Sequence, residues 1–143
     1  MEPKTITTKL YIDCEFNGFG GELISMALFA EHDLYFYEVL ECDEPDGWVA
    51  EHVMPFLNKH PIDKEIFKAK LQSFLGGFEH VEIIADWPED IIHFCSKLLT
   101  GPGMMLQTMP VITMTIDRNL GSGNSRIPHN ALEDARAIRE MAL

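Results

Sequence analysis

The chain of 143 residues has the length of one domain, so we expect a single domain over residues 1–143. Hydrophobic residues make up 46% and charged residues 24% of it, which is a globular and not a disordered composition. The formal net charge of −12 argues against tight electrostatic binding to long duplex DNA, because such binding requires a basic face.

Neither a membrane segment nor a secretion signal is indicated. The apolar runs are far shorter than the ~20 residues that cross a bilayer, and Asp13 and Glu15 interrupt the N-terminal segment. The three cysteines, Cys14, Cys42 and Cys95, contain no C-x-x-C pair, so neither a disulfide framework nor a zinc site is indicated. We therefore expect a cytoplasmic protein without a membrane partner.

The N-terminal part predicts three strands, at residues 9–14, 22–30 and 34–40. The turn sequences NGFGG (17–21) and EHD (31–33) separate them, so we expect an antiparallel meander. Leu10, Ile12 and Cys14 should share one face of the first strand.

The remainder predicts alternating helices and strands. Helices are expected from residue 45 or 46 to 57, with Trp48 on the apolar side, and at 62–75, 88–99 and 130–141. Strands are expected at 81–85 and 111–116, and a Gly/Ser/Asn-rich loop at 118–128. This order predicts an α/β fold with a mixed five-stranded sheet, a meander extended by two parallel strands and flanked by helices, similar to the ribonuclease H-like fold.

The sequence Asp13-Cys14-Glu15 places two carboxylates on the same side of the first strand, because side chains at i and i+2 point to one face. Two such carboxylates raise each other's pKa unless a cation lies between them. By itself the pair is also compatible with a solvated strand end.

Two helix starts share a pattern, DWPED at residues 86–90 and NALED at 130–134. Each predicts a capping box, with an Asx residue at the N-cap and a glutamate three residues later. Asp90 and Asp134 then occupy the fourth helical position, which usually faces the protein, where a carboxylate needs a partner. If the first helix begins later, Asp86 replaces Asp90 as the functional residue.

His129 directly precedes the last helix, near Asp134, and follows the Gly-rich loop. A histidine at the end of a mobile-looking loop can approach and deprotonate an attacking water. We expect one pocket of four carboxylates, from Asp13, Glu15, Asp90 and Asp134. Such a pocket suits two hard divalent cations, Mg²⁺ or Mn²⁺. Two such ions can clamp the attacking and leaving oxygens of a phosphodiester.

These residues resemble the DEDD exonucleases with a histidine in the third motif, the proofreading-exonuclease group of the ribonuclease H-like superfamily. Asp13-x-Glu15 is similar to the first motif, Asp90 to the second, and His129-x₄-Asp134, within HNALEDAR, to the third. The stretches YIDCEF, ELISMALFA and WVAEHVMPFL resemble most the polyadenylate-specific exoribonuclease AS type. One departure is Glu89, where the family usually has an apolar residue.

The resemblance implies 3′→5′ hydrolysis that releases nucleoside 5′-monophosphates, with two Mg²⁺ held by Asp13, Glu15, Asp90 and Asp134, and with His129 as general base. It further implies a homodimer and a substrate of single-stranded RNA, while short DNA 3′ ends remain open. The negative charge agrees with a short or single-stranded substrate. Two alternatives stay open: a non-catalytic binding module of the same fold, and a nucleotidase acting on small molecules.

Several further residues are candidates for substrate contact. In the resembled family, apolar groups after the first motif stack on the terminal base, which here points to Phe16, Phe19 and Leu23. Trp87, near the rim of the pocket, could stack in the same way, although packing in the core is the favoured interpretation. Arg118 and Arg126 flank the loop before His129, and we expect phosphate contact from them.

Overall fold

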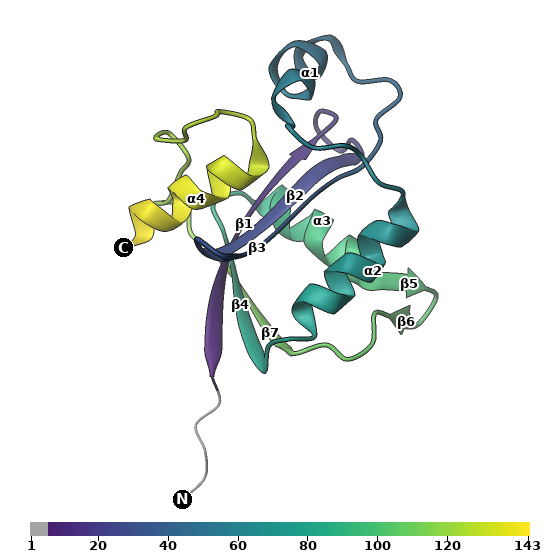
Figure 1. Ribbon diagram of the computed structural model, residues 1–143, viewed down its shortest axis with the longest axis vertical. Helices are drawn as coiled ribbons and strands as arrows, with labels where there is room; N and C mark the ends of the chain where they lie inside the picture. The colour runs from purple at the N-terminus through teal and green to yellow at the C-terminus, as the bar shows by residue number, and fades with distance from the viewer. Residues whose placement is uncertain (1–5) are drawn as a thin grey trace, which may run out of the picture.

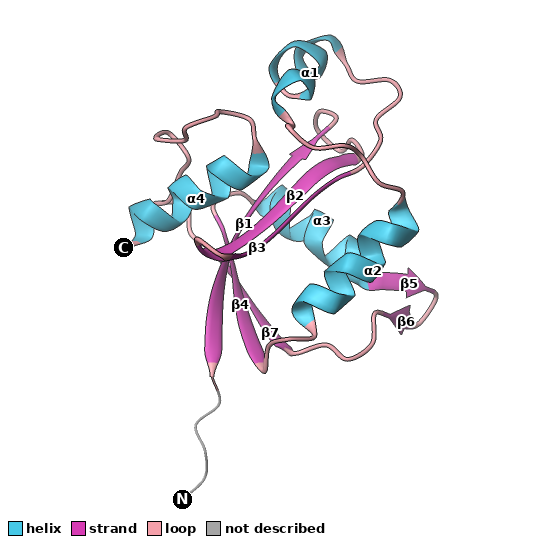
Figure 2. Ribbon diagram, in the orientation of Figure 1, coloured by secondary structure: helices cyan, strands magenta, loops and turns pink. Residues whose placement is uncertain are grey.

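The computed structural model describes residues 6–143 and contains a five-stranded mixed sheet with helices on both faces (Figures 1 and 2). The sheet consists of β1 (Thr7–Phe16), β2 (Leu23–Glu31), β3 (Leu34–Val39), β4 (His80–Ala85) and β7 (Val111–Ile116). The helices are α1 (Gly47–His52), the 3₁₀ turn η1 (Met54–Phe56), α2 (Lys64–Leu75), α3 (Pro88–Leu98) and α4 (Ala131–Ala142). No described helix is long and apolar enough to cross a membrane.

The strand order is β3-β2-β1-β4-β7. β1 pairs antiparallel with β2, and β2 antiparallel with β3, whereas β1–β4 and β4–β7 are parallel. The predicted meander extended by two parallel strands is therefore confirmed. A short hairpin, β5 (Leu99–Gly101) and β6 (Met104–Met105), was not predicted, because Gly101-Pro102 indicated only the end of a helix.

The two faces of β1 carry different cores. Leu10, Ile12 and Cys14 share one face, as predicted, and pack with residues of α2 and α3 such as Phe67 and Phe94. Tyr11 lies on the opposite face with Ile138 of α4. In Figure 1, α4 accordingly crosses β1 and β2 on the side of the sheet away from α2 and α3.

The far end of β1 extends beyond its parallel neighbour. Pairing of β1 with β4 ends at Tyr11 and Ile84, whereas pairing with β2 continues to Phe16. The chain leaves β4 after Ala85 and enters α3 almost at once. The start of α3 therefore lies beside the unpaired edge of β1, which carries the acidic pair.

The helix expected to run from residue 45 or 46 to 57 is interrupted. Asp46 caps α1 by accepting a hydrogen bond from the backbone N–H of Val49, at 3.0 Å. The helix ends at His52, and Pro55 then lies in the 3₁₀ turn η1. Proline lacks a backbone N–H, so a continuous α-helix through this position would lose a hydrogen bond.

Candidate metal centre

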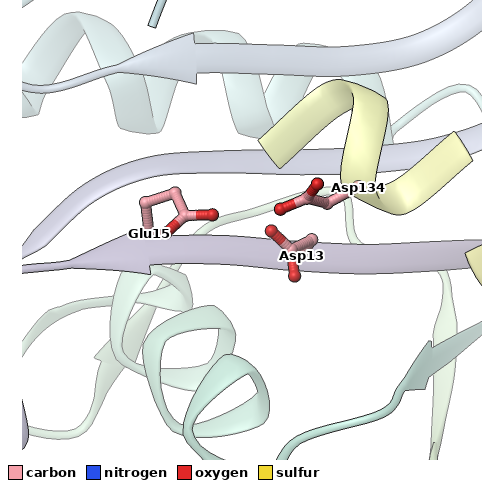
Figure 3. Close-up of side chains that lie close together, drawn as sticks. All are labelled: Asp13, Glu15 and Asp134. Carbon is pink, nitrogen blue, oxygen red and sulfur yellow. The ribbon is translucent and has the colours of Figure 1, made fainter. Parts of the chain in front are cut away.

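Three carboxylates from two elements meet above β1 (Figure 3). Asp13 and Glu15 project from the same face of the strand, and Asp134 projects toward them from α4. Each residue offers a ligand oxygen, and these oxygens all lie within 4.8 Å of one another. This spacing allows one cation to bind all three carboxylates.

A second group joins Asp13 to Asp86 and Asp90, again with one ligand oxygen from each residue within 4.8 Å of the others. Asp86 follows β4 directly, and Asp90 lies in the first turn of α3. The sequence posed Asp86 and Asp90 as alternatives, whereas the fold brings both to the same place. Asp13 belongs to both groups and therefore lies between two potential cation positions.

The expected capping role of Asp86 is wrong. α3 begins at Pro88, and its N-cap residue is Trp87, which makes no side-chain capping bond. Proline suits the first helical position because its fixed φ matches the helix and no N–H is needed there. Asp90 is consequently the third helical residue and not the fourth, and the carboxylate of Asp86 is free for the acidic cluster.

Only one of the two hydrogen bonds of the predicted capping box is present at the start of α4. The side chain of Asn130 accepts a hydrogen bond from the backbone N–H of Glu133, at 3.0 Å. The Glu133 carboxylate forms an ion pair with Arg136 (3.4 Å). Asp134 is the fourth residue of α4, as expected, and only 5% exposed.

Burial raises the pKa of every carboxyl in this cluster. Desolvation is the largest cause at Asp13, whose pKa lies well above its ordinary value, and the negative charge of Asp90 adds to it. The pKa of Glu15 rises to about 9 and that of Asp90 to about 8, again chiefly by desolvation. The pKa values of Asp86 and Asp134 are raised too. Without a cation, the cluster retains protons near neutral pH.

Three oxygens of the cluster are buried without a hydrogen-bond partner: Asp13 Oδ2, Asp90 Oδ2 and Asp134 Oδ1. A buried oxygen left in this state costs free energy, on the order of 1–3 kcal/mol. A divalent cation would satisfy these oxygens and neutralise the charge that desolvation penalises. The donor set, oxygen atoms only, is the one preferred by hard cations.

His129 lies beside the cluster with its ring against a tryptophan. Burial raises the pKa of Asp134, and the neighbouring His129 partly offsets this rise. The φ of His129, 70°, lies in the left-handed region. The ring meets Trp48 edge to face, with centroids 5.1 Å apart, and Trp48 in turn stacks on His52 at 4.7 Å. The sequence placed Trp48 on the apolar side of a helix, but it is 54% exposed.

An aromatic cavity of about 560 Å³ adjoins Glu15. Its aromatic lining consists of Phe16, Phe19, Trp48 and Trp87. Trp87 is 46% exposed, so the expectation of core packing is wrong. Exposed ring faces next to a carboxylate cluster offer a place where a nucleobase can stack.

The turn at one side of this cavity is rigidly fixed. The Asn17 side chain donates to the Glu44 carbonyl at 3.0 Å and accepts from the Asp46 N–H at 2.9 Å. Gly18 has a φ of 76°, and a Cβ there would lie 2.8 Å from Asp46 Oδ2. These contacts tie residues 17–21 to the start of α1.

The other residues predicted to contact the substrate, Leu23, Arg118 and Arg126, do not line the aromatic cavity. Leu23 is 4% exposed and belongs to the core; it does not line the aromatic cavity but a second cavity, with Gly20 and Gly21, so its role in substrate binding stays a prediction. Arg118 donates to the Asp86 carbonyl and lies over the Trp87 ring at 4.8 Å, beside the cluster. Arg126 is exposed on the loop before α4, and within residues 6–143 it makes no ion pair with the acidic cluster.

Comparison with models of known protein families and with curated proteins gave no match.

Proposed function

We propose that the protein is a metal-dependent 3′→5′ exonuclease of the ribonuclease H-like fold, in the DEDD group with a histidine. It hydrolyses single-stranded RNA, or short DNA 3′ ends, and releases nucleoside 5′-monophosphates. One observation carries the proposal: four carboxylates converge around that of Asp13, with buried unpartnered oxygens, next to an aromatic cavity.

The metal ions in this proposal are two Mg²⁺ or Mn²⁺. Asp13, Glu15 and Asp134 would hold one ion, and Asp13, Asp86 and Asp90 the other. When bound, such ions polarise the scissile phosphate and stabilise the charge on the attacking and leaving oxygens. Asp13 is the only carboxylate common to both groups, so it has the largest influence on both positions.

The protein's own side chains would position the substrate. The rings of Phe16, Phe19, Trp48 and Trp87 would hold the terminal base by stacking, at about 1–3 kcal/mol for each stacked base. Glu15 lines the same cavity, where its carboxylate can accept a hydrogen bond from a ribose hydroxyl. Arg118, beside Asp86, supplies positive charge at the edge of the centre.

His129 is the proposed general base. One ring nitrogen takes a proton from the attacking water, for which the ring leaves Trp48 and turns toward Asp134. The preceding loop, residues 117–128, lacks helices and strands and contains Gly121 and Gly123, so it has the freedom to permit this movement. Contact with Trp48 would hold the ring in a resting position until substrate binds.

End-labelled RNA and DNA oligonucleotides incubated with Mn²⁺ test the proposal. We expect stepwise shortening from the 3′ end in the parent protein and none in Asp13→Asn. Asp33→Asn is the matched control, because its side chain is 96% exposed on the β2–β3 turn. Shortening by Asp13→Asn at the parent rate would refute the proposal.

The same preparation distinguishes the alternatives. Faster turnover of mononucleotides than of oligonucleotides would identify a small-molecule nucleotidase. Absence of Mn²⁺ uptake by calorimetry, together with absence of cleavage, would identify a non-catalytic module. The net charge of −12 supports the alternative of a non-catalytic module, because an acidic surface can mimic nucleic acid.

The proposal includes a homodimer and a cytoplasmic location. The outer strand of the sheet, β7, exposes the apolar side chains of Val111 (63%), Met114 (41%) and Ile116 (46%). Exposed apolar residues on an edge strand offer a surface for self-association. Sedimentation equilibrium tests this part, with Val111→Lys expected to shift a dimer toward the monomer.

A further inference from the structure

A second cavity, of about 480 Å³, lies on the other side of the 17–21 turn from the aromatic cavity. Gly20 and Gly21 line this second cavity, whereas Gly18 and Phe19 line the first. The turn is therefore a wall shared by the two. The backbone N–H of Gly20 donates to Glu89 at 3.5 Å, which links the wall to the start of α3.

Helix α3 connects the metal centre to this second cavity. Asp90, His93 and Lys97 have the spacing i, i+3, i+7, which places them along one side of the helix. Asp90 belongs to the acidic cluster, and His93 and Lys97 line the second cavity. At 1.5 Å per residue, Lys97 lies roughly 10 Å from Asp90 along the helix axis. That distance suits the nucleotides next to a scissile bond.

Two lysines from two helices line this cavity. Lys64 begins α2 and Lys97 lies near the end of α3, whereas Lys68 of α2 donates to the Leu99 carbonyl and does not line the cavity. Burial lowers the pKa of Lys97, and the charges of Lys64 and Lys68 lower it further. Lysines 59 and 70 pair with Glu38, but among residues 6–143 neither Lys64 nor Lys97 forms an ion pair. The ammonium groups of Lys64 and Lys97 are therefore available to bind a phosphate, although carboxylates also line this cavity.

The rest of the lining indicates what kind of anion. Four carboxylates also line the cavity. Glu22 accepts a hydrogen bond from Cys42 and Asp63 caps α2, so Glu41 and Asp43 are the two that can accept hydrogen bonds from hydroxyl groups of a ligand. The His93 ring packs on Phe16 with centroids 4.9 Å apart, which leaves one ring of the pair next to the cavity and the other next to Glu15. Cationic groups for a phosphate, carboxylates for ribose hydroxyls and an aromatic ring for a base together match a ribonucleotide.

We propose that this cavity binds the ribonucleotide immediately upstream of the scissile bond, with its phosphate on Lys64 and Lys97 and its ribose hydroxyl on Glu41 or Asp43; this inference rests on the proposed function. The 3′-terminal nucleotide fills the aromatic cavity, and the strand crosses the 17–21 turn into the second cavity. The 2′-hydroxyl contact gives a preference for RNA over DNA.

Binding of labelled oligonucleotides, followed by fluorescence anisotropy with Ca²⁺ in place of Mg²⁺, tests this cavity. Lys64→Gln and Lys97→Gln each retain a long polar side chain and remove one charge. We expect each to raise the Kd of an RNA pentamer about two- to five-fold and to reduce the slope of log Kd against log salt by about 0.7. Lys9→Gln, at an exposed position on β1, is the matched control and should behave like the parent.

Ligand length and sugar provide the second comparison. A nucleoside 5′-monophosphate, which fills the aromatic cavity alone, should bind the lysine variants and the parent equally. In cleavage assays, the variants should raise KM for the pentamer and leave kcat unchanged. The parent should bind the RNA pentamer more tightly than its DNA counterpart, and Asp43→Asn should reduce that difference.

The outcomes separate this cavity from the proposed function. If the parent cleaves RNA and both lysine variants behave like Lys9→Gln, the cavity assignment is wrong and the exonuclease stands. If the parent binds the pentamer through these lysines without cleaving it, the cavity assignment stands and the exonuclease does not. If the parent neither binds nor cleaves RNA, both are wrong. Lys64 is exposed on the first turn of α2, so its replacement should leave folding intact.

Discussion

Raising the pH of the metal-free protein from 5 to 8 perturbs the acidic cluster without any mutation. In the folded state Glu15 and Asp90 keep their protons to pKa values of about 9 and about 8, whereas their ordinary values are 4.5 and 3.8. Between these limits the folded state binds more protons than the unfolded chain. The free energy of unfolding is therefore highest at or below the ordinary pKa values. It falls as the pH rises from there and stops falling once the pH exceeds the pKa of the folded state.

The size of this effect follows from the proton difference. Each carboxyl that stays protonated only in the folded state lowers the free energy of unfolding by about 1.4 kcal/mol per pH unit. For Glu15 and Asp90 between pH 5 and 7, the loss is on the order of 3–5 kcal/mol. That loss is a large part of the roughly 5–15 kcal/mol that stabilises a typical domain. Asp13 and Asp134 change in the same direction.

Urea denaturation at pH 5, 6, 7 and 8 measures the loss directly, once with a chelator and once with excess Mn²⁺. We expect a steep fall with the chelator and a much smaller one with Mn²⁺, because the cation holds the cluster in its ionised form. Asp90→Asn removes one titrating group and should reduce the slope of the metal-free protein. Asp33→Asn, at its exposed turn, should leave that slope unchanged.

Two results would refute the reasoning. A free energy of unfolding that stays constant or rises from pH 5 to 8 without metal would mean that the carboxyls ionise normally in the folded protein. An Asp33→Asn effect as large as that of Asp90→Asn would mean that overall charge, and not the cluster, determines the pH dependence.

The remaining predictions concern the proposed metal ligand Asp86, the contact between Trp48 and His129, and the 17–21 turn. Asp86→Asn should reduce Mn²⁺ uptake from two ions to one, as counted by calorimetry, while unchanged stoichiometry would make Asp86 a bystander. Trp48→Ala should raise KM several-fold, because it removes one of the rings proposed to stack on the terminal base, and it should not lower kcat, because it releases the His129 ring from its resting position; in solution, His129 ring resonances of the parent should show a ring-current displacement that Trp48→Ala removes. Gly21→Ala should destabilise the protein by more than 1 kcal/mol in thermal unfolding, because its Cβ would lie 1.9 Å from the Asn17 carbonyl oxygen.

Residue spacing was sufficient to predict the acidic pair and the sheet. Asp13 and Glu15 share a face because a strand repeats every two residues, and Asp134 faces the protein because Asn130 fixes the start of its helix. These are local rules. The same local reasoning was wrong at Asp86, where two starting points one residue apart were available and Pro88 selected the later one.

Long-range contacts account for what the sequence did not indicate. Trp48 meets His129 only because α1 and the loop before α4 come together over a separation of about eighty residues, and no periodicity predicts that contact. The convergence of Lys64 and Lys97 has the same origin, since α2 and α3 pack on one face of the sheet. Local patterns thus predicted on which face of a strand or helix a charged side chain lies, and tertiary packing determined which charged side chains meet.

The distribution of charge links metal binding to RNA binding. The net charge of −12 would repel a phosphate backbone, and five of the acidic residues lie at the proposed centre. Two divalent ions would offset four negative charges at the point where the scissile phosphate must lie, while Lys64 and Lys97 attract the next phosphate. RNA affinity should therefore rise with metal occupancy, and by thermodynamic reciprocity RNA should tighten metal binding by the same factor. Equal RNA affinity with chelator and with Ca²⁺ would show that the acidic cluster and the RNA path are separate.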